Sequence, residues 1–125
     1  MCSYSGINFL PVALSPLLNT VLRRKLSFDG FVISDYDDLF KIKDQQLPTS
    51  FQTFNEVNSS VCQMLNAGVD MQMMSSRGGY EVYAQAIKIG LKNNTITMDR
   101  LNDAVARIMA VKIALGVAKV KSNMR

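Results

Sequence analysis

The acidic cluster at residues 34–38 (Ser-Asp-Tyr-Asp-Asp) is the part of the sequence whose residue types and spacing best suit chemistry. It directly follows Phe31-Val-Ile33, an apolar run without polar alternation, which is typical of a strand buried on both faces. We therefore expect Asp35 to emerge at the rim of a pocket. A carboxylate there can act as a nucleophile, a general base or a metal ligand. Position alone leaves a helix cap or an ordinary loop carboxylate as the alternative.

The remaining chemistry-bearing residues exclude several kinds of site. Asp37 and Asp38 extend the acidic cluster, but their spacing matches no calcium loop, so we expect no metal ion. The chain has no His, which excludes a Ser-His-Asp or Cys-His nucleophile system and a His-ligated zinc site. Cys2 and Cys62 form no CxxC motif and are interpreted as two isolated thiols. We therefore expect no cofactor.

The elements that would position these residues alternate between strand and helix. Ser15-Pro16 is typical of a helix start, with Ser as the cap and Pro at the first helical position. The patterns predict strands at residues 1–4, 31–33 and 69–73, and helices at residues 16–25, 54–66, 80–92 and 98–115. We interpret residues 6–11, 41–50 and 75–79 as loops. This order predicts an α/β fold with parallel strands joined by right-handed crossovers.

In parallel α/β folds, working groups lie at the carboxyl ends of the strands. The first predicted strand offers Ser3 and Tyr4 there. The second offers residues 34–36, and the third offers Asp70, Met71 and Met73. The methionines around position 73 are interpreted mainly as core or pocket lining.

Composition bounds the size of the fold and its partners. The chain has 125 residues, 48% hydrophobic and 19% charged, which suits one globular domain or a piece of one. Three parallel strands have two open edges and cannot readily cover both faces, so the organisation indicates a segment of a larger α/β fold. The net charge of +4 is mild, and we expect no nucleic-acid partner. No apolar stretch is long enough to span a bilayer, and residues 1–10 do not resemble a signal peptide.

Several segments together resemble glycoside hydrolase family 3. Residues 28–36, Phe-Asp-Gly-Phe-Val-Ile-Ser-Asp-Tyr, resemble the family's nucleophile strand, usually written G-F-V-x-S-D-W. Residues 1–8 resemble M-x-S-Y-x-x-x-N-G, and residues 17–23 resemble L-L-x-D-V-L-R. Residues 67–71 match A-G-x-D-M. Residues 100–108 and 111–116 match the run R-I-D-D-A-V-x-R-I-L-x-V-K-F-x-L-G-L-F that closes the catalytic domain. The motifs follow the family order over nearly the whole chain and are most similar to the β-glucosidase and exo-β-glucanase branch.

The resemblance implies a retaining, exo-acting glycosidase for terminal β-D-glucosyl residues of a β-glucoside or β-glucan. It implies that Asp35 is the catalytic nucleophile, which forms a covalent glycosyl-enzyme, and that Tyr4 lies beside it. Tyr36 replaces the usual Trp, whose ring stacks on a sugar, and Met1 and Met73 would line the same substrate-binding subsite. The implied fold is a partial (β/α)8 TIM-like barrel, comprising about the last three βα units.

The sequence also departs from the family pattern. The upstream half of the barrel, with its Arg and Lys-His pair, has no counterpart, and the acid/base residue normally comes from a following domain. Phe9 and Thr20 stand where Gly and Asp are usual.

Residues 1–117 would then be the C-terminal portion of the catalytic barrel domain. Residues 118–125 would be a basic tail where the interdomain linker begins. We expect this chain to be inactive alone and to need the missing barrel half and second domain. A full-length relative would be extracellular or lysosomal/vacuolar. The alternative is a non-enzymatic truncated paralogue, a relic or a chain that associates with another through its open sheet edge.

Overall fold

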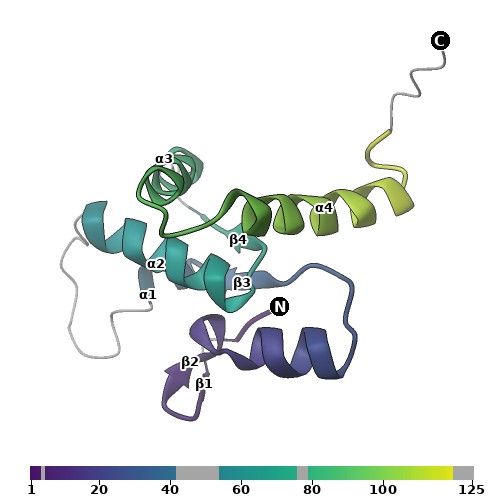
Figure 1. The fold of residues 1–125 in the computed structure, drawn as a ribbon, viewed down its shortest axis with the longest axis horizontal. Helices are drawn as coiled ribbons and strands as arrows, with labels where there is room; N and C mark the ends of the chain where they lie inside the picture. The colour runs from purple at the N-terminus through teal and green to yellow at the C-terminus, as the bar shows by residue number, and fades with distance from the viewer. Residues whose placement is uncertain (4, 42–53, 76–78, 120–125) are drawn as a thin grey trace.

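A computed structural model of the chain describes residues 1–3, 5–41, 54–75 and 79–119. In chain order, the elements are β1 (Gly6–Ile7), β2 (Leu10–Pro11), the 3₁₀-helix η1 (Val12–Leu14), the π-helix η2 (Leu18–Lys25), β3 (Ile33–Tyr36), α1 (Asp38–Lys41), α2 (Phe54–Ala67), β4 (Met71–Met73), α3 (Gly79–Lys92) and α4 (Met98–Ala114). Figure 1 shows β3 and β4 at the centre, surrounded by helices. The predicted α/β class is confirmed.

Strands β3 and β4 form a parallel pair, as the alternation of elements predicted. The predicted strand at residues 31–33 begins later, at Ile33, and runs to Tyr36. The delay has a clear cause, because the Val32 N–H donates to the Asp70 carboxylate at 2.7 Å instead of to a strand carbonyl. At the other end, the Asp37 N–H donates to the Met73 carbonyl at 2.9 Å, which extends the contact between the strands.

The first three residues lie against the other edge of β3, although the predicted strand there is wrong for the residues described. The Cys2 N–H donates to the Ile33 carbonyl at 2.8 Å, whereas the Val32 carbonyl accepts from residues 70 and 71. Consecutive carbonyls of a strand point to opposite edges, so this segment and β4 flank β3. The Ser3 hydroxyl accepts from the Ser5 N–H, and such local bonds compete with a strand ladder.

Residues 6–11, predicted as a loop, form a two-stranded antiparallel hairpin in which Gly6 pairs with Pro11. Both turn residues have positive φ, 52° at Asn8 and 65° at Phe9, which is the pattern of a type I′ turn. Such turns usually carry Asn-Gly, so Asn-Phe gave no hairpin signal. The Phe9 side chain is fully exposed.

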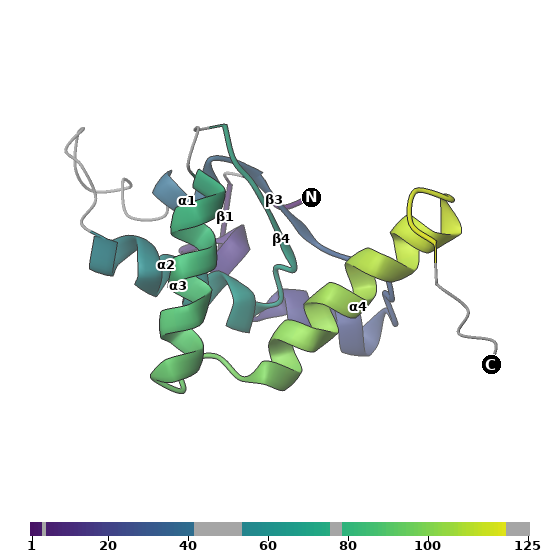
Figure 2. The same ribbon diagram turned by 90° about the horizontal axis from the view of Figure 1, so that it is seen from above.

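Helices α2 and α3 pack side by side, and η2 lies next to the C-terminal end of α2 (Figures 1 and 2), where the Asn19 side chain bonds the backbone carbonyl of Asn66. A Cβ at Gly90 would stand 2.6 Å from the Cys62 sulfur, so glycine allows α3 to approach α2 closely. Gly68, at φ 118°, ends α2, and its N–H donates to the carbonyls of Met64 and Leu65. The core gathers around α2, with Val61, Met64, Leu65, Val69, Ala86 and Ile96 among its buried members.

Two helices differ in how closely they follow their predicted spans. Helix α4 starts at the Thr97 cap, which accepts from the Arg100 N–H at 3.1 Å, and carries Asp99 in its first turn and Lys112 in its last. Helix η2 was predicted from Pro16, but it begins at Leu18 and is wound as a π-helix. Its last turn is closed by the Leu26 N–H donating to the Val21 carbonyl.

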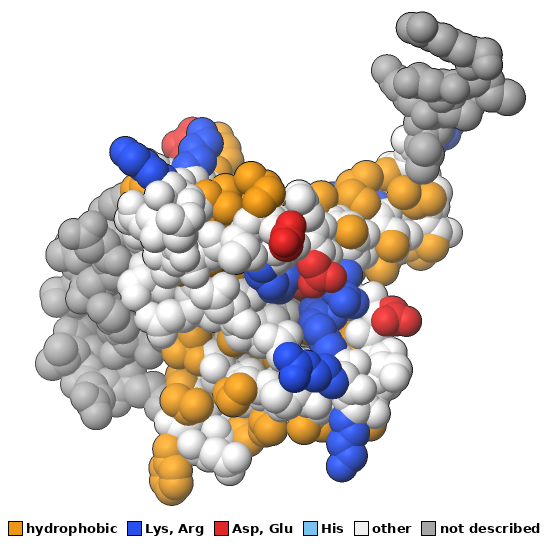
Figure 3. Space-filling view, in the orientation of Figure 1, with side chains coloured by type: hydrophobic (Ala, Val, Ile, Leu, Met, Phe, Trp, Pro, Cys, Tyr) orange, Lys and Arg blue, Asp and Glu red, His pale blue; other side chains and the backbone are white. Residues whose placement is uncertain are grey.

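The C-terminal half of α4 projects away from the rest of the molecule (Figures 1 and 2). Figure 3 shows apolar side chains gathered along this projecting part. The exposed apolar residues of α4 include three at four-residue spacing, namely Val105, Met109 and Ile113. We call these three residues the α4 stripe.

Candidate active site at the carboxyl ends of the strands

Asp35 lies on β3 near its carboxyl end, where the predicted pocket rim should be. Its side chain is half-buried, between the buried Ser34 and the exposed Tyr36. One carboxylate oxygen, Oδ1, accepts from the N–H of Tyr36 at 2.7 Å. This carboxylate combines partial burial with access to solvent, which suits a nucleophile or a general base.

Ser34 sets the backbone at this point. Ile33 pairs with Met71, and Tyr36 pairs with Met73. Between these two pairs β3 has one more residue than β4, which makes a β-bulge. The Ser34 hydroxyl compensates for this bulge by accepting from the Met73 N–H at 2.9 Å. It also donates to the carbonyl of Asp35 at 2.9 Å. Bulges commonly re-aim a side chain, and this one lies at Asp35.

Asp37 ties together the segments that follow the two strands. It has φ 54°, and its carboxylate accepts from the N–H of Ser75 at 2.9 Å and from the Ser75 hydroxyl. Asp38 is buried at the start of α1. The three acidic residues of the cluster therefore differ in environment. Asp35 is half-buried, Asp37 bonds to Ser75, and Asp38 is buried. Within the residues that the structure describes, no group of three or more His, Cys, Asp or Glu side chains is arranged to hold a metal ion.

The N-terminal segment lies along one edge of β3, where the Cys2 N–H donates to the carbonyl of Ile33, the first residue of that strand. Met1 is 77% exposed, whereas Cys2 is buried against β3. Burial raises the pKa of the Cys2 thiol from its ordinary value of 9.0 to about 11, with further contributions from the negative charges of Asp38 and Asp35. The charges of the site carboxylates therefore contribute to the raised pKa of Cys2, and its thiol carries no reactive thiolate at neutral pH.

The predicted substrate-binding residues are partly brought together. Tyr36 and Met73 are register partners on β3 and β4, and Tyr36 is 49% exposed. Met1 lies next to Cys2 on the other edge of β3. Tyr4 falls outside the described residues, so its role stays a prediction.

Asp70 departs from the position expected for it. The sequence placed it at the carboxyl end of the third strand, but it precedes β4 and lies at the amino end, with its side chain fully buried. Its oxygens accept from Arg23, Arg100 and the Val32 N–H, at 2.5, 2.7 and 2.7 Å. We call Asp70, Arg23 and Arg100 the basal ion cluster.

The basal ion cluster also holds backbone groups. Arg100 donates to the carbonyls of Leu65 and Val69, at 2.8 and 3.0 Å, and Arg23 donates to those of Gly30 and Gly68. These bonds fasten α4 and η2 to the ends of α2 and β3. Sequence reasoning missed the cluster, because Arg23, Asp70 and Arg100 lie far apart in the chain.

A cavity of about 320 Å³ opens beneath the N-terminal segment. Met1, Cys2, Leu22, Phe28, Phe31 and Val32 contribute to its largely apolar lining, and Asp35 does not. Among the described residues, no helix combines the length and the apolar character that crossing a membrane requires.

Comparisons with known proteins agree on one family. The family model for the glycosyl hydrolase family 3 N-terminal domain matches residues 1–111. A β-N-acetylglucosaminidase/β-glucosidase from Cellulomonas fimi is 32% identical over 110 residues, covering 85% of this chain and 17% of that protein. A lysosomal β-glucosidase from Dictyostelium discoideum is 29% identical over 119 residues, covering 94% of this chain and 13% of that protein.

Solved structures extend the likeness to the fold. The β-glucosidase from Listeria innocua, in complex with isofagomine, superposes with a TM-score of 0.74 and 24% identity. The match covers 98% of this chain and 16% of that one. This chain thus spans about a sixth or less of the length of these three relatives.

Proposed function

The chain belongs to glycosyl hydrolase family 3, and on this premise we propose that it is a piece of a retaining, exo-acting β-glucosidase with Asp35 as its nucleophile. By family it is a glycoside hydrolase. The observation that supports the nucleophile is the position of Asp35, half-buried near the carboxyl end of β3. The bulge at Ser34 and the bond from the Tyr36 N–H hold that carboxylate in one orientation.

The proposed reaction has two displacements. In the first, an Asp35 carboxylate oxygen attacks the anomeric carbon, and the bond from that carbon to the leaving oxygen breaks. A second carboxyl group protonates the leaving oxygen. In the second, that group accepts a proton from water, which attacks the anomeric carbon and releases the sugar and the Asp35 carboxylate. Such carboxyl groups lie about 5–5.5 Å apart in retaining enzymes.

The surroundings of Asp35 support the proposed substrate. The exposed ring of Tyr36 can stack on a β-glucosyl unit of a β-glucoside or β-glucan, with less area than the usual Trp. Met73, its register partner, and Met1 on the other side of β3 would complete an apolar rim. Tyr4 is proposed as a partner of the Asp35 carboxylate on the resemblance alone.

We further propose that residues 1–117 supply the closing βα units of a (β/α)8 barrel, with residues 118–125 starting a linker. The chain would be inactive alone, because the rest of the barrel and a second domain carry the other sugar-binding groups and the acid/base. The exposed α4 stripe supports this proposal, since contiguous apolar surface usually marks a contact with further polypeptide. The same stripe favours the alternative, a chain that only associates with another protein. An extracellular or lysosomal location is proposed on the resemblance.

A chimera tests the catalytic proposal. Residues 1–111 would replace the aligned segment of the Cellulomonas fimi relative, and the product would be incubated with a 2-deoxy-2-fluoro-β-glucoside. The fluorine slows breakdown of the covalent intermediate, so intact mass and peptide mapping should find a glycosyl adduct on Asp35. The chain alone should acquire none.

Two variants of the chimera make the result specific. Asp35→Asn should abolish the adduct, whereas Asp37→Asn, two residues away, should retain it. An adduct on another carboxylate, or labelling that survives Asp35→Asn, would refute the assignment. Thermal melting of both variants confirms that they are folded.

A further inference from the structure

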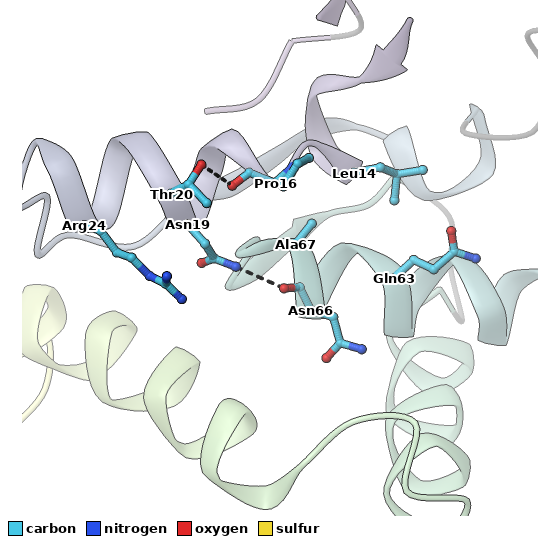
Figure 4. Close-up of a pocket in the computed structure, with 8 residues that line it drawn as sticks. All are labelled: Leu14, Pro16, Asn19, Thr20, Arg24, Gln63, Asn66 and Ala67. Carbon is cyan, nitrogen blue, oxygen red and sulfur yellow. Dashed lines mark hydrogen bonds between the residues drawn. The ribbon is translucent and has the colours of Figure 1, made fainter. Parts of the chain in front are cut away.

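A hollow of about 450 Å³ opens between η2 and the C-terminal half of α2. Figure 4 shows its two walls: Asn19, Thr20 and Arg24 come from η2, and Gln63 and Asn66 come from α2. This volume lies within the range of small-molecule sites. None of the lining residues belongs to β3 or β4, so the hollow is separate from the proposed active site.

The walls are fixed relative to each other by side-chain hydrogen bonds. The side-chain amide of Asn19 donates to the backbone carbonyl of Asn66 at 3.1 Å, which joins η2 to the end of α2. The Asn66 amide donates to the Thr95 carbonyl at 2.9 Å, which holds that side chain in place. A ligand would therefore meet a preformed surface and would lose little affinity to ordering it.

The charge of the lining is one-sided. Arg24 is its one charged residue, and no carboxylate contributes to the lining. Among the described residues, Arg24 has no ion-pair partner, whereas the adjacent Arg23 is committed to Asp70. A guanidinium offers five donors in a planar fork that matches a carboxylate or a phosphate.

The opposite wall offers neutral groups. The Gln63 amide gives one N–H to the Ser59 hydroxyl at 2.8 Å, and its second N–H and its carbonyl oxygen take no part in that bond. The side-chain oxygen of Asn66 likewise takes no part in the bond that the Asn66 side-chain N–H donates to the Thr95 carbonyl. Carboxamides both donate and accept, which suits the hydroxyl groups of a sugar.

We propose that this hollow binds a small hydroxylated anion, namely a monosaccharide that carries a carboxylate or a phosphate group. Arg24, the charged residue of the lining, sets the orientation of the anion. The anionic group should face Arg24 and the hydroxyl groups should face α2. Leu14, Pro16 and Ala67 provide apolar contact for the ring. Because the hollow is open, the dissociation constant should be on the order of 1 mM.

Nuclear magnetic resonance titration of the full chain tests the proposal. The probes are glucuronate, glucose 6-phosphate, glucose and inorganic phosphate, and the readout is the side-chain amide signals of Asn19, Gln63 and Asn66. The two anionic sugars should shift these signals in a saturable manner. Glucose alone and phosphate alone should each bind at least about tenfold more weakly. The two sugar arms distinguish carboxylate from phosphate recognition.

Variants decide which groups bind. Arg24→Gln should weaken binding of the anionic sugars about tenfold, and Gln63→Leu should weaken it severalfold. Lys25→Gln, which removes the adjacent cation outside the hollow, should change it less than twofold. Phosphate binding as tight as the sugars would reduce the hollow to a general anion site and overturn the proposal. Equal losses for Arg24→Gln and Lys25→Gln, or absence of saturable shifts, would do the same.

Discussion

The two ends of the β3–β4 pair place an aspartate in opposite situations. Asp70, at the amino end, is fully buried and accepts from η2, from α4 and from the backbone leading into β3. Asp35, near the carboxyl end, is half-buried and accepts from the N–H of the next residue. The Asp70 carboxylate is committed to structural hydrogen bonds, whereas the Asp35 carboxylate is partly exposed to solvent. The difference lies in how many elements of this chain converge on each end.

The convergence at the amino end extends along α4. Asp103 accepts from Arg100 at 3.1 Å and from Arg107 at 3.0 Å, and Arg107 also donates to the Asp29 carbonyl. These bonds lie in the first part of α4. The α4 stripe begins at Val105, within the same part of the helix, and its four-residue spacing places it on the face opposite the ion pairs, so ion pairing and apolar exposure separate around a single helix.

The largest expected effect comes from breaking the basal ion cluster. Asp70→Asn leaves two guanidinium groups near a neutral amide, and loss of one member of a buried ion pair costs about 3–5 kcal/mol. Urea denaturation followed by circular dichroism would measure the loss in free energy of unfolding. The matched control is Asp35→Asn, which should stay within about 0.5 kcal/mol. Similar losses for both variants would mean that the two ends do not differ as described.

Ser34→Ala should have an intermediate effect, because it removes the hydroxyl that replaces a ladder bond at the bulge. The Met73 N–H then loses its partner, and a buried unsatisfied group costs about 1–3 kcal/mol. Exchange of the backbone amide hydrogen should be faster at Met73 and less affected at residues of the basal ion cluster. The exposed Ser3→Ala serves as a control and should leave both stability and exchange at Met73 unchanged. Unaltered exchange in Ser34→Ala would contradict the role assigned to this hydroxyl.

The smallest expected effect is a dependence on alkaline pH. The pKa of Cys2 is raised by burial to about 11, so the unfolded chain releases this proton at lower pH than the folded chain does. Stability from this thiol is complete below pH 9.0 and is lost as pH rises toward 11.

Comparing urea denaturation at pH 7.5 and pH 10 would measure this decline, which should be smaller in Cys2→Ala. Burial also raises the pKa of Tyr83, to about 12, so part of the decline should persist in the variant. A variant with the full decline would show that the N-terminal segment is not packed against β3.

Sequence patterns predicted those features whose causes are local. The patterns predicted a helix at residues 98–115, close to the observed Met98–Ala114, and the parallel pairing followed from the alternation of strands and helices. The hairpin was not predicted, because Phe9 occupies a turn position that usually carries Gly. Asp70 was misplaced because its two guanidinium partners lie 47 and 30 residues away, beyond the reach of any local pattern.

The distance in sequence between Asp70 and its two arginine partners also determines when the basal ion cluster can form during synthesis. A ribosome adding roughly 5–20 residues per second needs about 2–6 s to pass from Asp70 to Arg100. During this interval the nascent chain holds Asp70 and Arg23 without the cation that completes the cluster. The amino end of the sheet therefore cannot close until α4 begins to emerge, and premature release or stalling between these two residues should yield a product prone to degradation.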